Sequence, residues 1–312
     1  MRTNEGATHS RGGLLMGSFD RFARRLETVD ETPEPFRSPL VSELSSEDSV
    51  QLLVFGPRSE SFGDFSPGTV LAITSRRWIV VSEQQRGGVT VVSSNFANTL
   101  FVELTIVLLF GKLRIAFVAD AKAQSVEMEF NTVMRRLYTQ AAQLLLDKMD
   151  TSLTTPHDNT SPDTMGFLDP LPYKFRNAVP RFTPVGQQIL TVEYWPALYG
   201  RKMRFFQYEV VPEGVLVLTD RELMLLSEEK TWSWTRIARQ PKHGYIVTHC
   251  PLSRLADFWI TEHDQLITLQ LEMRVPNGCG PVGFDLSPEQ RTAVVALMER
   301  AVQVRAAGAE VA

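Results

Sequence analysis

The stretch Val70–Glu83, VLAITSRRWIVVSE, decides how this chain folds, because a closely similar line, VLVLTDRELMLLSE, returns at Val215–Glu228. With Val70 aligned to Val215, six positions are identical, and most of the others exchange one apolar residue for another. Each copy consists of two apolar runs around a short polar break, at residues 75–76 or 220–221. Continuous apolar runs around such a break predict a tight β-hairpin, because a helix would space its apolar residues by three and four.

The elements predicted after each hairpin also follow the same order. In the first half, strands predicted over 112–118 and 125–130 precede an amphipathic helix with the apolar face Val133, Met134, Leu137, Ala141, Leu144 and Leu145. In the second half, strands over 266–273 and 282–286 precede a helix with the apolar stripe Val294, Leu297, Met298 and Ala301. A small bent sheet leaves one end of its core open, and an amphipathic helix covers that end.

We therefore expect an α+β fold that is mainly β, with two units that are each a strongly bent antiparallel sheet or barrel closed by one C-terminal helix. This layout resembles the bacterial pleckstrin-homology-like (PH-like) domains and the similar GRAM domains. The resemblance is carried by LAITSRRWIVVSE, LVLTDRELMLLSE, the segment CPLSRLADFWI at 250–260 and the two closing helices. It covers roughly residues 48–148 and 186–306. The alternative is one large α+β domain that contains two hairpins of similar composition.

The composition along the chain predicts the domain boundaries. Residues 1–42 are polar and carry three prolines, so we expect a mostly disordered tail. The exception is Ser18–Val29, which is either a short helix docked on the first domain, part of the tail, or a helix that lies on a membrane surface. A segment rich in Ser, Thr, Pro and Asp at 150–168 is predicted to be a linker. The two PH-like domains are then expected over 43–149 and 169–308, with a tail at 309–312.

Charge and hydropathy exclude several classes of protein. The net charge of −4 argues against a nucleic-acid binder, which needs a basic surface. The most apolar run, at 99–110, is too short to span a membrane and carries Glu103, so it predicts a buried strand or strand pair. With two cysteines and no export signal, we expect a cytoplasmic protein, with a membrane-peripheral position as the alternative.

Catalytic and metal chemistry have weak support in the sequence. The candidates are His243, His249, Cys250 and Cys279, which are residue types that bind zinc. His249 and Cys250 are adjacent, however, and neighbours in a strand point to opposite faces. The sequence contains no Cys-x-x-Cys, no Gly-x-Ser-x-Gly and no phosphate-binding glycine loop. We therefore rank a hydrolase or metal protein third among the functions and expect no cofactor.

A basic and aromatic loop is the sharpest binding candidate. The segment WPALYGRKMRFFQY at 195–208 interleaves cations with aromatic rings, and its candidate residues are Arg201, Lys202, Arg204, Tyr199 and Phe205. The resemblance to PH domains implies that the loop between the first two strands binds lipid phosphates. Cations near an anionic membrane surface contribute about 1 kcal/mol each, so the loop favours weak, salt-sensitive membrane binding. The alternative is that the aromatic residues begin a strand and the cations are only solvated.

Trp232 and Trp234 offer a second binding surface, because alternate residues share one face of a strand. Exposed, the pair would anchor a protein partner; buried, it would belong to the core. From these features the sequence predicts a non-catalytic binding or scaffold protein that acts through an unknown protein partner. A peripheral binder of anionic lipids is the alternative.

Overall fold

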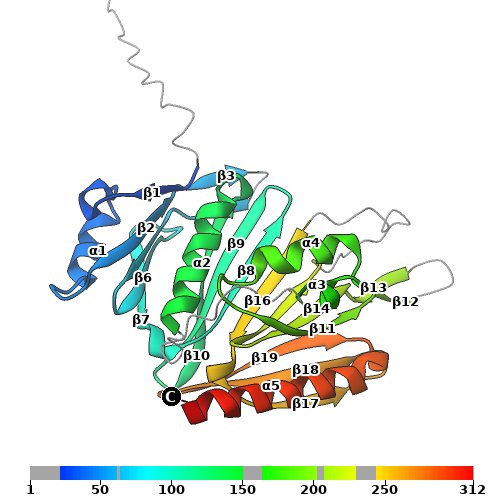
Figure 1. Ribbon diagram of the computed structural model, residues 1–312. Helices are drawn as coiled ribbons and strands as arrows, with labels where there is room; N and C mark the ends of the chain where they lie inside the picture. The colour runs from blue at the N-terminus through cyan, green and yellow to red at the C-terminus, as the bar shows by residue number, and fades with distance from the viewer. Residues whose placement is uncertain (1–21, 62–63, 150–163, 202–206, 230–243, 312) are drawn as a thin grey trace, which may run out of the picture.

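The computed structural model describes residues 22–61, 64–149, 164–201, 207–229 and 244–311 (Figure 1). The first half runs through the long strands β2 (Val50–Gly56), β5 (Thr69–Thr74), β6 (Arg77–Glu83), β7 (Val89–Asn95), β8 (Thr99–Val107), β9 (Phe110–Ala119) and β10 (Lys122–Asn131). Helix α2 (Arg135–Met149) follows. Short strands β3 (Ser59–Ser61) and β4 (Asp64–Ser66) form a hairpin between β2 and β5.

The second half repeats this order. Its long strands are β11 (Ile189–Trp195), β14 (Gly214–Thr219), β15 (Glu222–Ser227), β16 (Gly244–Pro251), β17 (Leu255–Glu262), β18 (Ile267–Val275) and β19 (Gly278–Leu286). Helix α5 (Arg291–Val311) ends the described chain. The hairpin of β12 (Leu198–Arg201) and β13 (Gln207–Val211) stands between β11 and β14.

Three sheets carry these long strands. The five-stranded sheet has the order β1-β2-β5-β6-β7, where β1 is Arg24–Leu26, and the three-stranded sheet has the order β17-β18-β19. The seven-stranded sheet has the order β10-β9-β8-β16-β15-β14-β11 and therefore combines strands from both halves. The two halves meet in it where β8 pairs with β16 in antiparallel fashion. None of these sheets closes into a barrel among the described strands.

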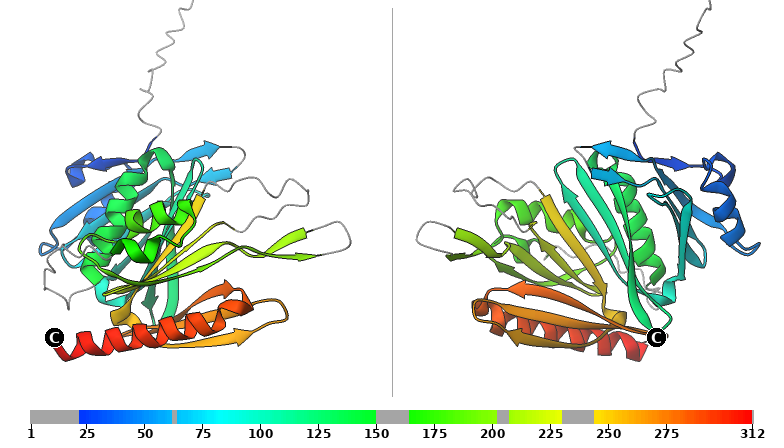
Figure 2. Two further views of the ribbon diagram at one scale, coloured as in Figure 1. Left: turned by 45° about the vertical axis from the view of Figure 1, so that its right-hand side comes forward. Right: turned by 180° about the vertical axis from the view of Figure 1, so that it is seen from behind.

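Figure 2 shows how the sheets and helices are layered, and three apolar clusters lie between them. The largest fills the space between the five-stranded sheet, α2 and one face of the seven-stranded sheet. The second lies between the opposite face of the seven-stranded sheet, the three-stranded sheet and α5. The third covers the outer face of the five-stranded sheet beneath α1 (Arg37–Glu43). The prediction of a mainly β fold with a C-terminal helix is confirmed.

The two predicted hairpins form as β5–β6 and β14–β15, and a threonine fixes each turn. Thr74 Oγ1 accepts hydrogen bonds from the backbone N–H groups of Arg76, at 3.2 Å, and Arg77, at 3.1 Å. Thr219 Oγ1 accepts from Arg221 N at 3.2 Å and Glu222 N at 2.9 Å. The side chain therefore satisfies amides that the tight turn leaves without a strand partner.

The N-terminal segment departs from the prediction. Residues 22–42 are ordered, whereas their composition predicted a tail, and residues 24–26 pair with β2 as a strand instead of forming a helix. Leu26, Phe36 and Leu40 are buried in the cluster on the outer face of the five-stranded sheet. Because the hairpin strands are apolar on both faces, that outer face also needs a cover, and this segment supplies it.

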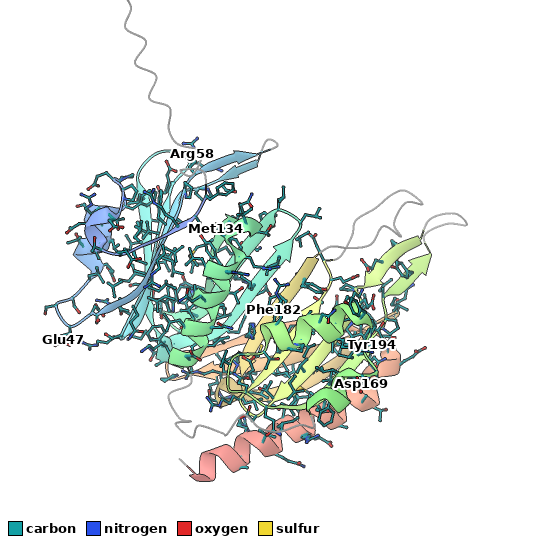
Figure 3. The ribbon with its side chains drawn as sticks, turned by 45° about the horizontal axis from the view of Figure 1, so that its top comes forward. Glu47, Arg58, Met134, Asp169, Phe182 and Tyr194 are labelled. Atoms are coloured by element: carbon teal, nitrogen blue, oxygen red, sulfur yellow. The ribbon has the colours of Figure 1, made fainter. Side chains whose placement is uncertain are left out.

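The predicted linker is also shorter than expected. Residues 150–163 lie outside the described residues, but Thr164–Leu168 form helix α3, and Tyr173–Phe182 form helix α4. Figure 3 labels Phe182 at the end of α4 and Tyr194 on β11. The Phe175 ring of α4 lies 6.0 Å from the ring of Tyr194, so α4 packs on the seven-stranded sheet.

The apolar run at 99–110 forms β8 and the start of β9, as predicted, but its turn is not buried. Leu108 and Leu109 are 66% and 68% exposed, and Phe110 is 44% exposed. Val133 is exposed as well, and Thr132 beside it donates a hydrogen bond to Leu108 O. The turn therefore presents an apolar tip, a kind of surface that favours contact with a partner.

Candidate binding cleft

A cleft of about 220 Å³ lies between the seven-stranded sheet and β19. Its lining comes from five strands and the segment before β14: Glu103, Trp195, Pro212, Leu225, Ser227, Ile246, Thr248, Gly283, Phe284 and Asp285. Glu103 comes from the first half of the chain and the other lining residues come from the second, so the β8–β16 pairing assembles the cleft.

The polar groups of the cleft are acidic or hydroxylic. Glu103 Oε2 accepts a hydrogen bond from Thr248 Oγ1 at 3.2 Å, and Arg114 Nη1 lies 3.9 Å from its other oxygen. Asp285 Oδ1 accepts from Thr268 Oγ1 at 2.9 Å. Asp285 is exposed and has no cationic partner among the described residues. The cleft therefore carries a negative charge that its own cations compensate only in part.

The apolar walls of the cleft are rigid. Trp195 is 1% exposed, and its indole N–H donates to Pro212 O at 2.9 Å, which fixes the plane of the ring. Gly214 packs directly against this ring. Phe284 is buried on β19. Small-molecule sites usually occupy about 300–1,000 Å³, so this cleft suits one long side chain of a partner better than a whole ligand.

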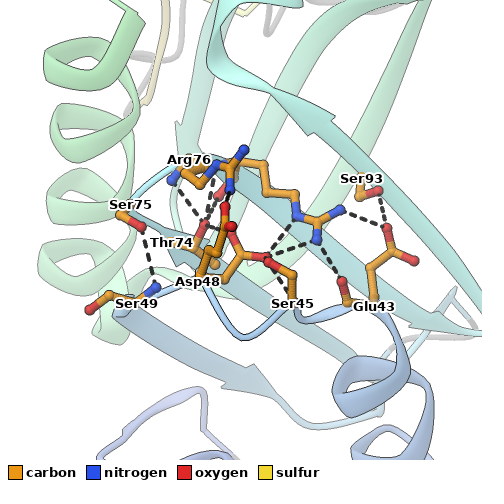
Figure 4. Close-up of polar contacts among 10 residues, drawn as sticks. Glu43, Ser45, Asp48, Ser49, Thr74, Ser75, Arg76 and Ser93 are labelled. Carbon is orange, nitrogen blue, oxygen red and sulfur yellow. Dashed lines mark hydrogen bonds and ion pairs between the residues drawn. The ribbon is translucent and has the colours of Figure 1, made fainter.

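A partly buried ionic network on the five-stranded sheet has a structural role (Figure 4). Arg77 donates to Asp48 Oδ2 from Nε at 3.1 Å and from Nη2 at 2.8 Å, and to the backbone carbonyl of Glu43. Ser45 also donates to Asp48 from its backbone and its side chain. Burial of the Asp48 carboxyl raises its pKa, but these hydrogen bonds outweigh burial and hold the pKa well below its usual range. The network joins α1 to the β5–β6 hairpin.

A second ionic cluster fastens α4 to the sheet. Lys174 donates to both Glu213 and Glu228, and Tyr194 donates to Glu213 at 2.7 Å. Desolvation and the nearby carboxylate raise the pKa of Tyr194. Burial lowers the pKa of Lys174, but its two carboxylate partners raise it by more. The net shift of the pKa is therefore upward, and the lysine stays charged. Lys174 of α4 contacts carboxylates at both ends of the β14–β15 hairpin, so we assign the cluster a structural role.

The predicted catalytic and metal candidates do not come together. His249 is 3% exposed, and its Nδ1 lies 3.0 Å from Glu222 Oε1. Cys250 points to the opposite face, into the second apolar cluster, and desolvation raises the pKa of its thiol, which disfavours the nucleophilic thiolate. Cys279 is exposed on β19, and His243 lies outside the described residues. Among the described residues, no three His, Cys, Asp or Glu side chains are grouped to hold a metal.

The structure covers the predicted binding loop only in part. Tyr199 lies on β12 and is 46% exposed, and Arg201 ends that strand. Lys202, Arg204 and Phe205 lie outside the described residues, as do Trp232 and Trp234. The β12–β13 hairpin projects from the body of the molecule (Figure 2). Gly200 sits beneath the Tyr208 ring on the partner strand, where a side chain would clash with the ring.

No protein-family model matches the sequence, and a search of curated proteins also finds no match. In the described part of the chain, no helix is long and apolar enough to cross a membrane.

Sequence reasoning missed the cleft residues. Glu103 gave one signal, since a charge inside an apolar strand marks a position that faces away from the core. Asp285 gave a similar signal, because it alternates with the buried residues Phe284 and Leu286 on β19. Their proximity depends on the pairing of β8 with β16, which no local pattern predicts.

Proposed function

We propose that this chain is a non-catalytic binding protein built from two PH-like units that arose by internal duplication. Each unit has four long strands, then three strands, then one helix. The open sheets depart from a closed barrel, and the helices α2 and α5 cover the opening instead. The expected ligand is a partner protein, bound at the acidic cleft.

Matching strand registers support the duplication. In the first half Trp78 pairs with Ser94, and in the second Leu223 pairs with Cys250 at the corresponding place in the hairpin. A short 3-10 turn follows in each half, at Phe96–Asn98 and Leu252–Arg254. The next strand then begins with a register shift in both halves, after Thr99 in β8 and after Leu255 in β17. Similar composition alone would not reproduce these irregularities.

The only partly compensated negative charge of the cleft carries the functional proposal. A lysine or arginine side chain from a partner would place its cation near Asp285 and Glu103 and its aliphatic stem against Phe284. Hydrogen bonds to charged groups contribute about 1.5–3 kcal/mol, and an aromatic wall adds a cation–π contribution. The cleft therefore selects a basic side chain.

A peptide-binding assay tests the cleft. Fluorescent nonapeptides with one central lysine or arginine, in a background of serine and glycine, are titrated by anisotropy against the native chain and an Asp285→Lys variant. The native chain is expected to bind the basic peptides, and Asp285→Lys to weaken binding about tenfold or more, as the loss of one charged hydrogen bond predicts. Peptides with a central glutamate are not expected to bind.

A matched control is Glu289→Lys, which makes the same charge change at an exposed residue outside the cleft lining. This variant is expected to bind the basic peptides like the native chain. Equal affinity of Asp285→Lys and the native chain, or equal weakening in both variants, would rule out the cleft as the recognition site.

The second candidate function is binding to anionic membranes through the β12–β13 hairpin. The hairpin projects from the molecule, and Tyr199 and Tyr208 are 46% and 42% exposed on it (Figure 2). Tyrosine side chains settle at the membrane interface, and the cations Arg201, Lys202 and Arg204 of the same segment would face the headgroups.

Sedimentation with vesicles of graded phosphatidylserine content tests this candidate. Binding is expected to rise with anionic lipid, fall with salt and disappear when Arg201, Lys202 and Arg204 are all changed to Glu. The control changes three exposed cations elsewhere, Arg86, Lys122 and Arg136, to Glu. Absence of binding at low salt, or equal loss in both triple variants, would eliminate the membrane function.

A further inference from the structure

One strand pair joins the two halves of the chain. Residues 102–107 of β8 pair with residues 244–249 of β16 in antiparallel register, with Val102 opposite His249 and Ile106 opposite Tyr245. In its own half, β8 is the strand that follows the 3-10 turn, and β16 is the strand that precedes it. The junction therefore joins two different edges, one from each half.

The counterparts of these two strands are β7 and β17. In the proposed correspondence of the halves, β7 takes the place of β16, because each pairs with the second strand of the hairpin and ends at the 3-10 turn. Strand β17 takes the place of β8, because each follows that turn and carries the early register shift. The chain thus contains a second pair of edges of the kind that form the junction.

Both counterparts are edge strands. Among the described strands, β7 pairs only with β6 and β17 only with β18 (Figure 1). Natural edge strands usually carry charges or proline to prevent association. Strand β7 has neither. Strand β17 carries Asp257 and Glu262, but the segment between them, Phe258–Thr261, has no charge and no proline. Each edge also exposes an apolar side chain, since Val91 is 36% and Trp259 is 43% exposed.

We propose that two copies of this chain associate by pairing β17 of one copy with β7 of the other, in the register that β8 and β16 adopt within the chain. Transferring that register places Phe258 of one copy opposite Ser93 of the other and Thr261 opposite Thr90. Trp259 then lies opposite Val92, and the exposed Val91 lies opposite Ile260, so the exposed apolar residue of each edge gains an apolar partner. This inference rests on the proposed duplication of the two halves.

The start of β17 is consistent with this register. Arg305 of α5 donates to the backbone carbonyls of Leu255 and Ala256, which covers the first residues of the strand. The corresponding first residues of β8, Thr99–Phe101, also take no part in pairing with β16. Arg305 therefore leaves the backbone of β17 accessible after Ala256, and the proposed pairing with β7 begins shortly after it, at Phe258.

The contact is heterologous, because each copy contributes a different edge. Such contacts close into a ring when the rotation between copies permits it and otherwise extend as an open chain. In either case every added contact extends a sheet by backbone hydrogen bonds, as strand addition does in peptide recognition.

Cysteine cross-linking tests the register. On a Cys279→Ser background, which removes the exposed thiol, we would prepare Thr90→Cys and Thr261→Cys as separate proteins. Both threonines are exposed, and opposite residues in antiparallel strands lie about 4.5–5.5 Å apart, within reach of a disulfide. Oxidation of the mixture is expected to give a species of twice the 35.1 kDa chain mass.

The single variants provide the first control, since neither is expected to cross-link with itself. Thr292→Cys, at an exposed threonine on α5, replaces Thr261→Cys in the second control and is expected to give no product with Thr90→Cys. A mixture without cross-linked product, or equal product from either variant alone, would overturn the proposed pairing.

Light scattering after size-exclusion chromatography tests the association itself at up to about 100 µM protein, a range that detects micromolar affinity. The native chain is expected to exceed 35.1 kDa, and Trp259→Lys to run at that mass. Tyr173→Lys, at an aromatic residue that is 80% exposed on α4, is expected to keep the native mass. A native chain at 35.1 kDa throughout, or a Trp259→Lys variant of native mass, would refute the inference.

Peptide binding separates this inference from the cleft proposal. Trp259 does not line the cleft, so Trp259→Lys is expected to bind the basic nonapeptides like the native chain. Failure of self-association with intact peptide binding would remove only the present inference, whereas intact self-association without peptide binding would remove only the cleft.

Discussion

At the residue scale, the two hairpin threonines keep one role while their neighbours diverge. The Thr74 hydroxyl lies 3.1 Å from Asp48 Oδ1, and the Thr219 hydroxyl lies 2.7 Å from Gln187 Oε1, so the same contact joins each hairpin to the preceding loop. The residue that begins the second hairpin strand, however, changes from Arg77 to Glu222. Arg77 binds Asp48, whereas Glu222 binds His249. The backbone role of the threonine is retained because the turn needs it, while the charge pairs differ.

The Asp48–Arg77 pair predicts how stability depends on pH. The folded-state pKa of Asp48 lies below the unfolded value of about 3.9, so its contribution is complete above that value and is lost as pH falls through the folded pKa. The Asp48 side chain is 1% exposed and Arg77 is 25% exposed, so Asp48→Asn should lower the free energy of unfolding by about 1.5–3 kcal/mol at pH 7, as the loss of a hydrogen bond between charged groups does.

Urea unfolding at pH 7 and at pH 3 measures both effects. Asp48→Asn should lose less stability on acidification than the native chain, because the titrating carboxyl is gone. The exposed Asp264→Asn serves as the control and should follow the native curve. Parallel pH curves for Asp48→Asn and the native chain would contradict the assignment.

At the element scale, both halves place a helix before their first long strand and pack it on the outer face of the hairpin sheet. Helix α1 covers the five-stranded sheet, and α4 covers the corresponding strands of the seven-stranded sheet. The hairpin strands β5 and β14 are buried at every residue. A sheet that is apolar on both faces needs two covers, so these helices are part of the fold.

Leu40 tests whether α1 is integral to the fold. It is fully buried at 0% exposure, while its neighbour Val41 is 52% exposed on the same helix. Leu40→Ala should therefore lower the free energy of unfolding by about 2–5 kcal/mol, through lost burial and a residual cavity. Val41→Ala should change it by less than about 0.5 kcal/mol. Similar effects of the two substitutions in denaturant unfolding would show that α1 does not contribute to the core.

At the scale of the whole molecule, the two halves share the seven-stranded sheet and are also joined by the side chain of Arg254. Arg254, in the turn between β16 and β17, donates to Met149 O at the end of α2, at 3.2 Å, and lies 3.5 Å from Phe96 O. A cation at a helix C-terminus also interacts favourably with the helix dipole. Together with the β8–β16 pairing, this contact makes us expect one cooperative unfolding transition for both halves.

Differential scanning calorimetry of Arg254→Met checks this coupling. The substitution keeps an apolar stem but removes the charged donor. It should therefore lower the free energy of unfolding by about 1.5–3 kcal/mol, as the loss of a charged hydrogen bond does. It should also broaden or divide the single transition. The exposed Arg300→Met, on α5, should leave both the midpoint and the shape unchanged. A native chain with two separate transitions would show that the halves unfold independently.

The sequence by itself determined the two hairpins, several of the strands that follow them and the helices at the end of each half, because hydrophobic periodicity and turn residues act over a few neighbouring positions. The repeat of Val70–Glu83 at Val215–Glu228 also indicated two related halves. The sequence did not predict that residues 22–42 are ordered. Their few apolar residues are buried only because they pack on the outer face of the five-stranded sheet, most of which later residues form.

Only the tertiary structure decided how the halves meet. Two strand edges pair through backbone N–H and C=O groups, which all residues except proline have. The sequence of β8 or β16 therefore does not predict which strand it pairs with. That one pairing brings Glu103 to Thr248 across the junction and places Glu103 in the cleft that Asp285 also lines. It also leaves β7 and β17 as free edges among the described strands. Side-chain periodicity determines the local secondary structure. The cleft and the proposed contact between copies depend instead on which strand edges pair through their backbones.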